Sequence, residues 1–497
     1  MKRLQNAGFL ILLFSTSLRF ACQSQNLNEA EFRDKIHACW LGKNIGGTLG
    51  MPFEGKTDLN NLTFYTNLKS GEPAANDDLD LQILWLKALE ENNATVNAYT
   101  LGQYWLKYVP VDWNEYGVGK KNMKMGIMPP LSGEYNNVKW KNSNGAWIRS
   151  EIWACLAPGN PMLAARFAWE DACVDHGVAE GTIAEIFTAS LESAAFIESD
   201  RNKLIEFALA MIPGNSKTAI AVRTATEARK AGKDWQTARL EVIRITEDLG
   251  WFQAPRNEAF TMIGFLWGEG DFGKSICIAV NCGDDTDCTG ATLGSILGII
   301  GGTKTIPDKW REPVGDKIVT VAISGFDAPK TLNILTDNTL AMAKKMSEMY
   351  KMPFRITADQ SRIDNVSQLL KIDQPQLNEL LNRSPYRIIV NEQNLSVTVD
   401  YLKEPLITEN STRPFKLSVK NTGTKKRSVE IKISGLAEGS VIRGLPMAPI
   451  NLSSNAVKTF DLVMDFNKTM PVNKMAINLS CDGKDIEIPF VLINEKN

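Results

Sequence analysis

The sequence predicts a mainly α protein, in which an all-helical domain precedes a C-terminal immunoglobulin-like β-sandwich. From about residue 27 to 350 the apolar side chains recur with helical spacing, as in Leu79, Ile83 and Leu86. From about residue 386 the apolar period changes to two, which is typical of strands. The chain has 497 residues, which is too long for one typical core, so two domains are expected.

Three further segments complete the expected domain organisation. Residues 109–144 are rich in Pro, Gly, Asn and Tyr, which predicts a long irregular segment inside the helical domain (27–350). Residues 351–385 are mixed and polar with one short possible helix, and we treat them as a linker. Residues 386–497 contain about seven short alternating runs separated by turn signals, which indicates the sandwich.

The N-terminal residues 1–21 have the pattern of a secretory signal peptide. A charged start at Lys2 and Arg3 precedes a short apolar stretch that cannot span a bilayer. Cys22 follows Ala21 as in the lipobox of bacterial lipoproteins, although Arg19 stands where that pattern prefers an aliphatic residue. We therefore expect an exported protein, periplasmic or at the cell surface, with membrane contact only through a lipid on Cys22. A plain secretory signal is the alternative.

Composition and cysteine usage exclude two classes of function. The 55 basic residues are balanced by 57 acidic ones, and no basic run is interleaved with aromatic residues, so nucleic acid is not expected as a partner. Besides Cys22 there are seven cysteines, an odd number with no CxxC spacing and mostly apolar neighbours. This pattern favours buried thiols over a disulfide framework or a zinc site.

Two acidic clusters are the strongest chemical signals in the sequence. The first, Asn76–Asp80, stands at the start of a helical pattern, where helix capping is a sufficient explanation for one such cluster. The second, Asp284–Asp287, opens a segment with glycine at every fourth residue from Gly290 to Gly302. That spacing exposes the backbone of one helix face, so a second helix can approach closely. Three acids in four residues exceed what a cap needs and indicate a hard cation such as Mg²⁺.

Three separated motifs, in this order, resemble those of the ADP-ribosylglycohydrolase family. They are Gly42–Glu54 (GKNIGGTLGMPFE), Asn76–Asp78 (NDD) and Gly283–Asp287 (GDDTD). A weaker match follows in Asn144–Arg149 (NGAWIR) together with Asp175–Gly177 (DHG). The resemblance covers the chain from about residue 34 to 302. It implies a compact helical domain that binds two Mg²⁺ ions and cleaves a bond at C1 of ribose.

Carried over by position, the resemblance also implies roles for individual residues. Four aspartates, with the Asn76 carbonyl in place of a usual Thr, would be metal ligands, and Glu54 would be the catalytic residue that handles a metal-associated water. His176, Asn144 and Gly145 would lie at the substrate, with His176 near the ribose and diphosphate. The four aspartates are Asp77, Asp78, Asp285 and Asp287.

Four positions depart from the family pattern. Gly47 stands where Asp is frequent, Leu79 replaces a second Thr, Asp80 replaces a neutral polar residue, and Cys288 replaces a metal-binding Thr. A neutral thiol is a poor ligand for Mg²⁺. We therefore expect the second ion to bind more weakly, to bind through Thr289, or to be absent.

The two histidines and the aromatic residues of the irregular segment are less specific signals. For His37, beside Ile36 and Trp40, we expect a structural or partly exposed position. The aromatic residues around the segment fit a platform for a base or a sugar, although packing in the core is the commoner use of such residues. They are Trp105, Tyr108, Trp113, Tyr116, Tyr135 and Trp140.

The sequence thus predicts a metal-dependent glycosyl hydrolase that cleaves a ribosyl (ADP-ribosyl) or related glycosidic bond, with Glu54 assisting proton transfer. Its substrates would be ADP-ribosylated molecules or glycosidic small molecules and glycans. The expected export favours an alternative on the same fold, a furanosidase-like glycosidase that acts on carbohydrate. A catalytically inactive binding protein is a third reading, supported by Gly47 and Cys288.

Overall fold

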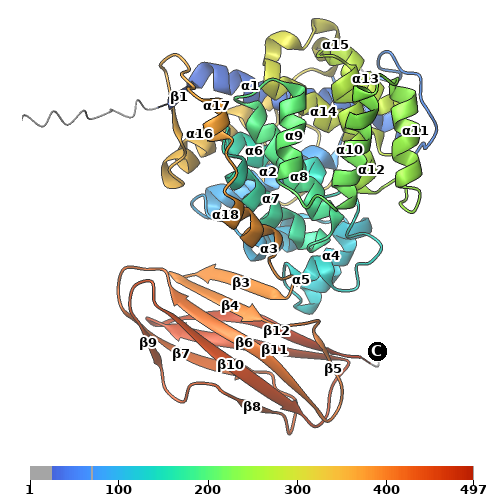
Figure 1. Cartoon of the computed structure of the whole chain (residues 1–497). Helices are drawn as coiled ribbons and strands as arrows, with labels where there is room; N and C mark the ends of the chain where they lie inside the picture. The colour runs from blue at the N-terminus through green and yellow to red at the C-terminus, as the bar shows by residue number, and fades with distance from the viewer. Residues whose placement is uncertain (1–24, 69–70, 496–497) are drawn as a thin grey trace, which may run out of the picture.

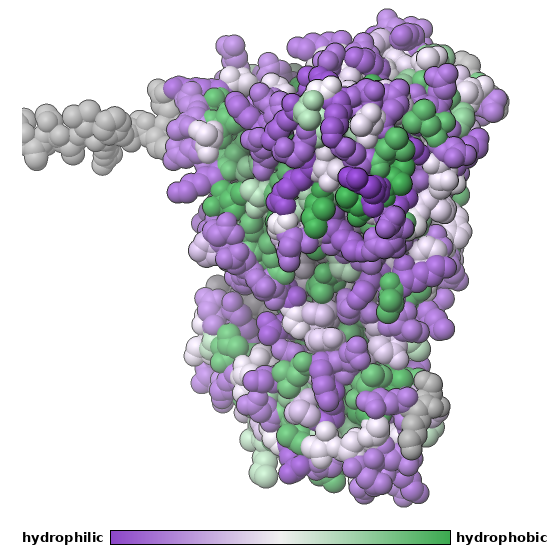
Figure 2. Space-filling view, turned by 45° about the vertical axis from the view of Figure 1, so that its right-hand side comes forward, coloured by the Kyte–Doolittle hydropathy of each residue, from purple (hydrophilic) through white to green (hydrophobic). Residues whose placement is uncertain are grey.

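The computed structural model describes residues 25–68 and 71–495. The expected signal peptide and Cys22 lie outside these residues. The chain forms two lobes, a helical domain and below it a β-sandwich (Figure 1). The face shown in Figure 2 is mainly hydrophilic, with apolar side chains in scattered groups. Both parts of the predicted fold class, the helical domain and the C-terminal sandwich, are confirmed.

The helical domain consists of helices connected mostly by short loops. Many helices begin at an Asn, Asp, Ser or Thr whose side chain accepts from a free backbone N–H, as Asn160 does from Leu163 N and Asp271 from Lys274 N. The helices are α1 (Glu29–Gly50), η1 (Met51–Phe53), α2 (Asp77–Glu91), α3 (Ala98–Tyr108), α4 (Asn114–Met125), α5 (Leu131–Glu134), η2 (Trp147–Arg149), α6 (Glu151–Leu156), α7 (Pro161–His176), α8 (Glu180–Ala195), α9 (Arg201–Ala210), α10 (Lys217–Lys230), α11 (Trp235–Ile245), α12 (Ala254–Trp267), α13 (Phe272–Asn281), α14 (Thr286–Gly301), η3 (Thr303–Thr305), α15 (Asp308–Val314) and α16 (Leu332–Met349).

Helices α1 and α14 cross in direct backbone contact at the centre of the domain. A Cβ added to Gly46 would collide with the Gly290 carbonyl, and one added to Gly42 would collide with Gly294. The glycine spacing seen in the sequence therefore serves close helix packing, as predicted. At the end of this contact the Thr286 hydroxyl donates to the Gly50 carbonyl over 2.8 Å. The packing thus brings the start of α14 beside the end of α1, where the first and third sequence motifs lie.

The segment 351–385, which we treated as a linker, packs against the helical domain. Strand β2 (Phe354–Thr357) pairs in parallel with β1 (Gln25–Asn28). Short α17 (Val366–Leu369) is followed by α18 (Gln374–Leu381), whose Leu377 and Leu380 are buried. The chain from 374 to 381 therefore belongs physically to the helical lobe.

The C-terminal domain is a sandwich of two five-stranded sheets with strand orders β3-β4-β6-β10-β8 and β5-β12-β11-β7-β9. The arrangement of β4, β6, β10 and β8 opposite β12, β11 and β7 has the order of an immunoglobulin fold. The seven runs predicted from the sequence are all strands, and the short β5, β8 and β9 were missed. The strands are β3 (Arg387–Glu392), β4 (Leu395–Asp400), β5 (Leu406–Ile407), β6 (Ser411–Asn421), β7 (Arg427–Ser434), β8 (Val441–Arg443), β9 (Ile450–Leu452), β10 (Val457–Phe466), β11 (Val472–Cys481) and β12 (Lys484–Asn494).

The sandwich contacts the side of the helical domain that carries α3, α5 and α18 (Figure 1). The Asn97 side chain, which caps α3, donates to the Ile389 carbonyl of β3 over 2.8 Å. Gly126, the residue that ends α4, lies against Val491 of β12. The two domains therefore meet at the start of α3 and at the C-terminal end of α4.

No helix of the described residues is long and apolar enough to cross a membrane. The described cysteines are buried free thiols, as predicted, at Cys39, Cys155, Cys173, Cys277, Cys282, Cys288 and Cys481. His37 is half-buried, with Nδ1 3.3 Å from the Thr336 hydroxyl, in agreement with a structural position.

Candidate active site

A pocket of about 360 Å³ in the helical domain collects most of the residues that the motifs single out. Its walls come from the end of α1 and from the starts of α2, α4 and α14, together with loops that precede η2, α12 and α16. Three helix N-termini thus border one pocket, and their dipoles favour negative groups there. The lining residues are Met51, Glu54, Ala75, Asp77, Trp113, Asn114, Glu115, Tyr116, Asn144, Gly145, Ile148, Trp251, Phe252, Asp285, Asp287, Cys288 and Val321.

Two groups of side chains in this site could hold a metal ion. One group is Glu54, Asp285 and Asp287, and the other is Asp78, Asp287 and Cys288. Within each group the ligating atoms lie within 4.8 Å of one another, and Asp287 belongs to both. The two acidic clusters, about two hundred residues apart in the sequence, therefore meet in space. A shared carboxylate is also what two neighbouring ions would need.

The carboxyl groups at the centre are chemically suited to a cation. Asp78 Oδ2, Asp285 Oδ1 and Asp287 Oδ1 are buried and have no hydrogen-bond partner among the described residues. Burial raises the pKa of all three carboxyls, and the charge of Asp287 raises the pKa of Asp78 and Asp285 further. Buried, unpaired carboxylates are costly, so a bound cation would stabilise the arrangement. The predominance of oxygen donors fits a hard cation.

Cys288 brings its thiol to the position predicted for it. Its Sγ lies 3.5 Å from Asp78 Oδ1, and burial raises the pKa of the thiol well above its usual value. A protonated thiol offers little to a hard cation. The neighbouring Thr289 hydroxyl, the replacement considered from the sequence, donates to the Thr286 carbonyl at 3.1 Å within its own helix.

Glu54 follows η1 at the edge of the pocket and is exposed. Partial burial, and then the charges of Asp287 and Asp77, raise its pKa to about 7. The backbone beside it is fixed to the start of α14, because Gly55 N donates to the Asp284 carbonyl at 2.9 Å. Glu54 is thereby held beside the acidic cluster at the edge of the pocket.

Asn76 and Asp77 show that the capping interpretation and the site interpretation apply together. The Asn76 carbonyl caps α2 by accepting from Asp78 N at 2.9 Å, and its amide nitrogen lies 3.3 Å from Asp287 Oδ2. Asn76 therefore presents its N–H to the cluster and uses its carbonyl at the helix start. Gly47 makes room for this amide, since a Cβ there would lie 2.7 Å from Asn76 Nδ2. Asp77 lines the pocket beside the two ligand groups.

Asn144 and Gly145 also line the pocket, and the structure shows what each contacts. Asn144 Nδ2 donates to Asp285 Oδ2 at 2.6 Å, while its carbonyl oxygen accepts from Trp147 Nε1 at 2.9 Å. Asn144 thus orients Asp285. Gly145 lies so close to Glu115 that an added Cβ would collide with the carboxyl oxygen Oε1.

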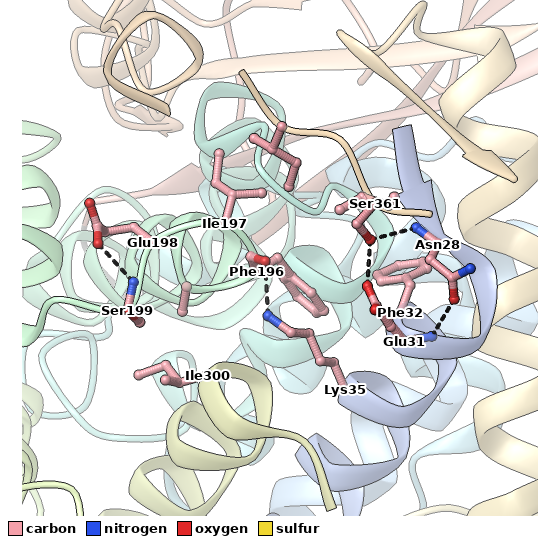
Figure 3. A pocket seen from close by; sticks show the side chains of 13 residues that line it. Asn28, Glu31, Phe32, Lys35, Phe196, Ile197, Glu198, Ser199, Ile300 and Ser361 are labelled. Carbon is pink, nitrogen blue, oxygen red and sulfur yellow. Dashed lines mark hydrogen bonds between the residues drawn. The ribbon is translucent and has the colours of Figure 1, made fainter. Parts of the chain in front are cut away.

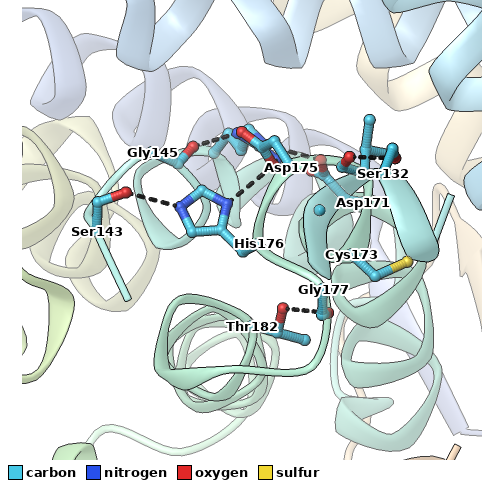
Figure 4. A network of polar contacts seen from close by, with 12 residues as sticks. Ser132, Ser143, Gly145, Asp171, Cys173, Asp175, His176, Gly177 and Thr182 are labelled. Carbon is cyan, nitrogen blue, oxygen red and sulfur yellow. Dashed lines mark hydrogen bonds and ion pairs between the residues drawn. The ribbon is translucent and has the colours of Figure 1, made fainter. Parts of the chain in front are cut away.

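His176 lies outside the pocket lining and is fully buried behind it. As Figure 4 shows, its ring bridges Ser143 and Asp175, with Nε2 3.1 Å from the Ser143 hydroxyl and Nδ1 2.9 Å from Asp175 Oδ1. Asp175 in turn pairs with Arg149 at 2.7 Å. His176 was predicted to lie at the substrate, but in this structure it does not line the pocket.

Several residues of the site were not found from the sequence. Lys43 is buried and lies 2.6 Å from Glu151 Oε1 and 3.9 Å from Asp78 Oδ2, which places a positive charge behind the acidic cluster. The position of Lys43 inside the first motif, Gly42–Glu54, could have pointed to a place in the site. Trp251 and Phe252 come from a loop with no motif, and Glu115 lies in the irregular segment where only the aromatic residues drew attention.

A second pocket, of about 290 Å³, lies near the described N-terminus between α1 and the end of α8 (Figure 3). Its polar groups are already paired: Lys35 Nζ donates to the Phe196 carbonyl at 2.9 Å, and Glu31 accepts from the Ser361 hydroxyl at 2.5 Å. Burial lowers the pKa of Lys35 to about 8. Among the described residues, groups of three His, Cys, Asp or Glu side chains that could hold a metal ion lie only at the first pocket, around Glu54, Asp285 and Asp287. We call this pocket the acidic pocket.

The helical fold carries a carboxyl-rich pocket at the starts of three helices, with side chains that could hold a metal ion. A family model described as ADP-ribosylglycohydrolase matches residues 28–345, and the chain belongs to this family. Membership indicates a glycosyl hydrolase. None of the curated proteins compared with the chain matches it.

Three solved structures are similar to parts of the chain. One described as an ADP-ribosylglycohydrolase-related protein complex is 19% identical, covers 64% of this chain and 99% of its own, and has a TM-score of 0.44. A FixG-related protein from Vibrio parahaemolyticus (12% identity, 21% and 98% coverage, TM-score 0.17) is similar to a smaller part. The GAE domain of GGA2p from Saccharomyces cerevisiae has 17% identity, 22% and 96% coverage and a TM-score of 0.16.

Proposed function

We propose that the protein is a magnesium-dependent glycosyl hydrolase that uses the acidic pocket as its active site. The observation that carries the proposal is the meeting of Asp78, Asp285 and Asp287, each with a buried carboxyl oxygen that has no partner among the described residues. Oxygen donors in this number favour Mg²⁺, and the sharing of Asp287 favours two ions.

The chain's own residues divide the chemistry among them. Asp78, Asp285 and Asp287 would hold the ions, and Asn144 keeps Asp285 oriented through its 2.6 Å hydrogen bond. When bound, the ions supply positive charge that polarises substrate oxygens and makes a water more acidic. Glu54, exposed at the edge of the cluster, takes the proton of the water that attacks the anomeric carbon as the glycosidic bond breaks.

Two substrate classes are candidates. Family membership favours a ribosyl bond in an ADP-ribosylated molecule. The pocket lining favours a second class, neutral carbohydrate glycosides, because Trp113 and Trp251 are partly exposed on it and its described lining residues include no Lys or Arg for a diphosphate. Exposed indole rings stack well on sugar faces. Export of the chain would also favour carbohydrate.

The decisive experiment is to incubate the purified protein with ADP-ribosylated peptides and a panel of aryl glycosides, with Mg²⁺ and with EDTA. We expect turnover that EDTA abolishes and Mg²⁺ restores. Glu54→Gln should lower turnover by about 10²–10⁴-fold, with a much smaller change in calorimetric Mg²⁺ affinity. Glu312→Gln, an exposed position on α15, is the matched control. Mg²⁺ binding without turnover of any substrate would favour the inactive binding protein instead.

We also propose that the chain is exported and carries lipid on Cys22, on the pattern of residues 1–21. These residues lie outside the described part of the structure. Cell fractionation of a bacterial host should place the wild type in the membrane fraction, while Cys22→Ser should release it to the periplasm or leave it unprocessed. Recovery of both proteins in the cytoplasm would contradict export.

A further inference from the structure

Glu115 is a second carboxyl in the pocket, separate from the proposed metal ligands. It is the second residue of α4 (Asn114–Met125), and its side chain is only 2% exposed. It lines the same pocket as Glu54, and its oxygen Oε2 has no hydrogen-bond partner among the described residues. A buried carboxyl with a free oxygen facing a reaction pocket needs a reason, because such a group costs stability.

The surroundings of Glu115 are built to admit this carboxyl. Gly145 provides the space, since any larger residue there would collide with Oε1 and with the carboxyl carbon. Ser143 lies near Glu115 and is held by His176 and the Trp140 carbonyl. Figure 4 shows Asp175 beside the His176 ring. Asp175 pairs with Arg149, and all three side chains are fully buried.

The burial of Glu115 favours its protonated form. Burial, followed by the charge of Asp175, raises the pKa of Glu115 to about 8. A protonated carboxyl carries an O–H that it can donate, and the oxygen Oε2 of Glu115 has no partner among the described residues.

We propose that Glu115 is a second catalytic residue, the general acid that protonates the leaving-group oxygen of the glycoside. The proposal rests on the glycoside hydrolysis proposed above. It also gives a new role to Gly145, which was assigned to substrate binding from the sequence: Gly145 makes room for the acid.

In the proposed reaction the bond between the anomeric carbon and the leaving oxygen breaks. Its electron pair stays on that oxygen, and the oxygen takes the proton of Glu115. Water adds to the anomeric carbon and gives its proton to Glu54, so the products are a free sugar and a free alcohol. The new Glu115 carboxylate lies in the first turn of α4, where the helix dipole favours negative charge. Exchange with solvent then returns Glu54 and Glu115 to their starting states.

The test compares leaving groups. The dinitrophenolate group of a dinitrophenyl glycoside leaves without protonation. The phenoxy and methoxy groups of phenyl and methyl glycosides of the same sugar need an acid to protonate the leaving oxygen. Glu115→Gln, which keeps the shape of the side chain, should leave kcat/KM on the dinitrophenyl glycoside within about threefold of wild type. On the phenyl and methyl glycosides it should fall by about 10²–10⁴-fold. Glu54→Gln, by contrast, should lower all three rates.

Each outcome has one meaning. If the wild type hydrolyses no glycoside in the panel, the proposed function fails and Glu115 falls with it. If the wild type is active and Glu115→Gln lowers all three rates equally, the general-acid role is overturned and the function stands. Thermal unfolding shows whether the variant folds. If it does not, the solvent deuterium isotope effect of the wild type decides: a larger effect on the phenyl than on the dinitrophenyl glycoside supports the proposal, and equal effects overturn it.

Discussion

The helical domain and the sandwich differ in how they hold buried carboxyl groups. In the sandwich, buried polar side chains secure the backbone: Arg413 donates to the carbonyls of Tyr401, Lys403 and Glu404, and Asn421 Nδ2 donates to that of Leu452. Among its described residues no buried carboxyl oxygen lacks a partner. The helical domain holds many such oxygens, on Asp78, Asp80, Glu115, Glu185, Glu192, Glu258, Asp284, Asp285 and Asp287.

This difference favours the helical domain as the place of the proposed reaction. An unpaired buried carboxyl costs stability, and a fold retains it where a ligand or a proton compensates. The sandwich resembles an ordinary structural module in this respect, whereas the helical domain holds these costly groups, three of them on the pocket-lining residues Glu115, Asp285 and Asp287. Substitutions of carboxyl groups in the two domains should therefore differ sharply in their effects.

The largest difference is expected for Asp287, the carboxylate shared by both ligand groups. Asp287→Asn removes a charged ligand from each group, so Mg²⁺ affinity should fall by about 100-fold or more and turnover should become undetectable. The control is Asp461→Asn in the sandwich, an exposed carboxylate 3.3 Å from Lys416. Calorimetry and initial rates on both variants give the comparison, and unchanged Mg²⁺ binding in Asp287→Asn would remove the proposed metal centre.

A second difference concerns how the free energy of unfolding depends on pH. The folded pKa of Glu115 is about 8, well above the value of about 4.3 for an unfolded glutamate. Between these values the folded protein holds a proton that the unfolded chain has lost, so this group makes stability fall as pH rises. The slope approaches about 1.4 kcal/mol per pH unit in the middle of the window. Glu115→Gln removes this loss, so in metal-free buffer its stability relative to wild type should rise from pH 5 to pH 8.

The measurement is urea unfolding at several pH values. Glu438→Gln, at an exposed position of the sandwich, should follow the wild type at every pH. Parallel curves for wild type and Glu115→Gln would mean that Glu115 is already ionised at pH 5, which would contradict the protonated acid.

The comparison also shows what the sequence could predict. The change of apolar period from helical to two located both domains, because each fold buries one regular face. The glycine spacing at Gly290 and Gly294 predicted a close helix contact, and the partner glycines on α1 lie in the first motif. The clusters at Asp78 and Asp285 were found because several acids in a few residues are chemically conspicuous.

The parts of the site that were missed depend on distant contacts. Glu115 is one acid among many until the fold buries it beside Gly145 and Ser143. His176 was placed at the substrate because its motif resembles one of the family, yet the ring is directed to Ser143 and Asp175. Spacing along the chain carries no information about which of two neighbouring layers a side chain will occupy.

A smaller effect is expected when Cys288 is replaced. Cys288→Thr puts a hydroxyl where the thiol now lies beside Asp78, and a hard cation prefers that oxygen, so Mg²⁺ affinity should rise by about tenfold. Cys481→Ser in the sandwich replaces another buried thiol and should leave calorimetric Mg²⁺ binding unchanged. Equal affinities for wild type and Cys288→Thr would show that this position does not contact the ion.

The smallest effect is expected when the whole sandwich is removed. A chain that ends at Pro385 keeps α18, whose Leu377 and Leu380 pack in the helical lobe, and keeps β2 in its pairing with β1. An end at Tyr350 would remove both, and is the poorer choice.

The cut at Pro385 exposes the surface around Asn97 and Gly126, but Gly126 ends α4 about 18 Å from the pocket end of that helix. Turnover of small glycosides should therefore stay within about twofold of the full chain, while thermal stability falls modestly because apolar surface is uncovered. If the shortened protein folds, as judged by circular dichroism, but has lost all turnover of small substrates, then the sandwich contributes to the active site and the division of labour between the domains is wrong.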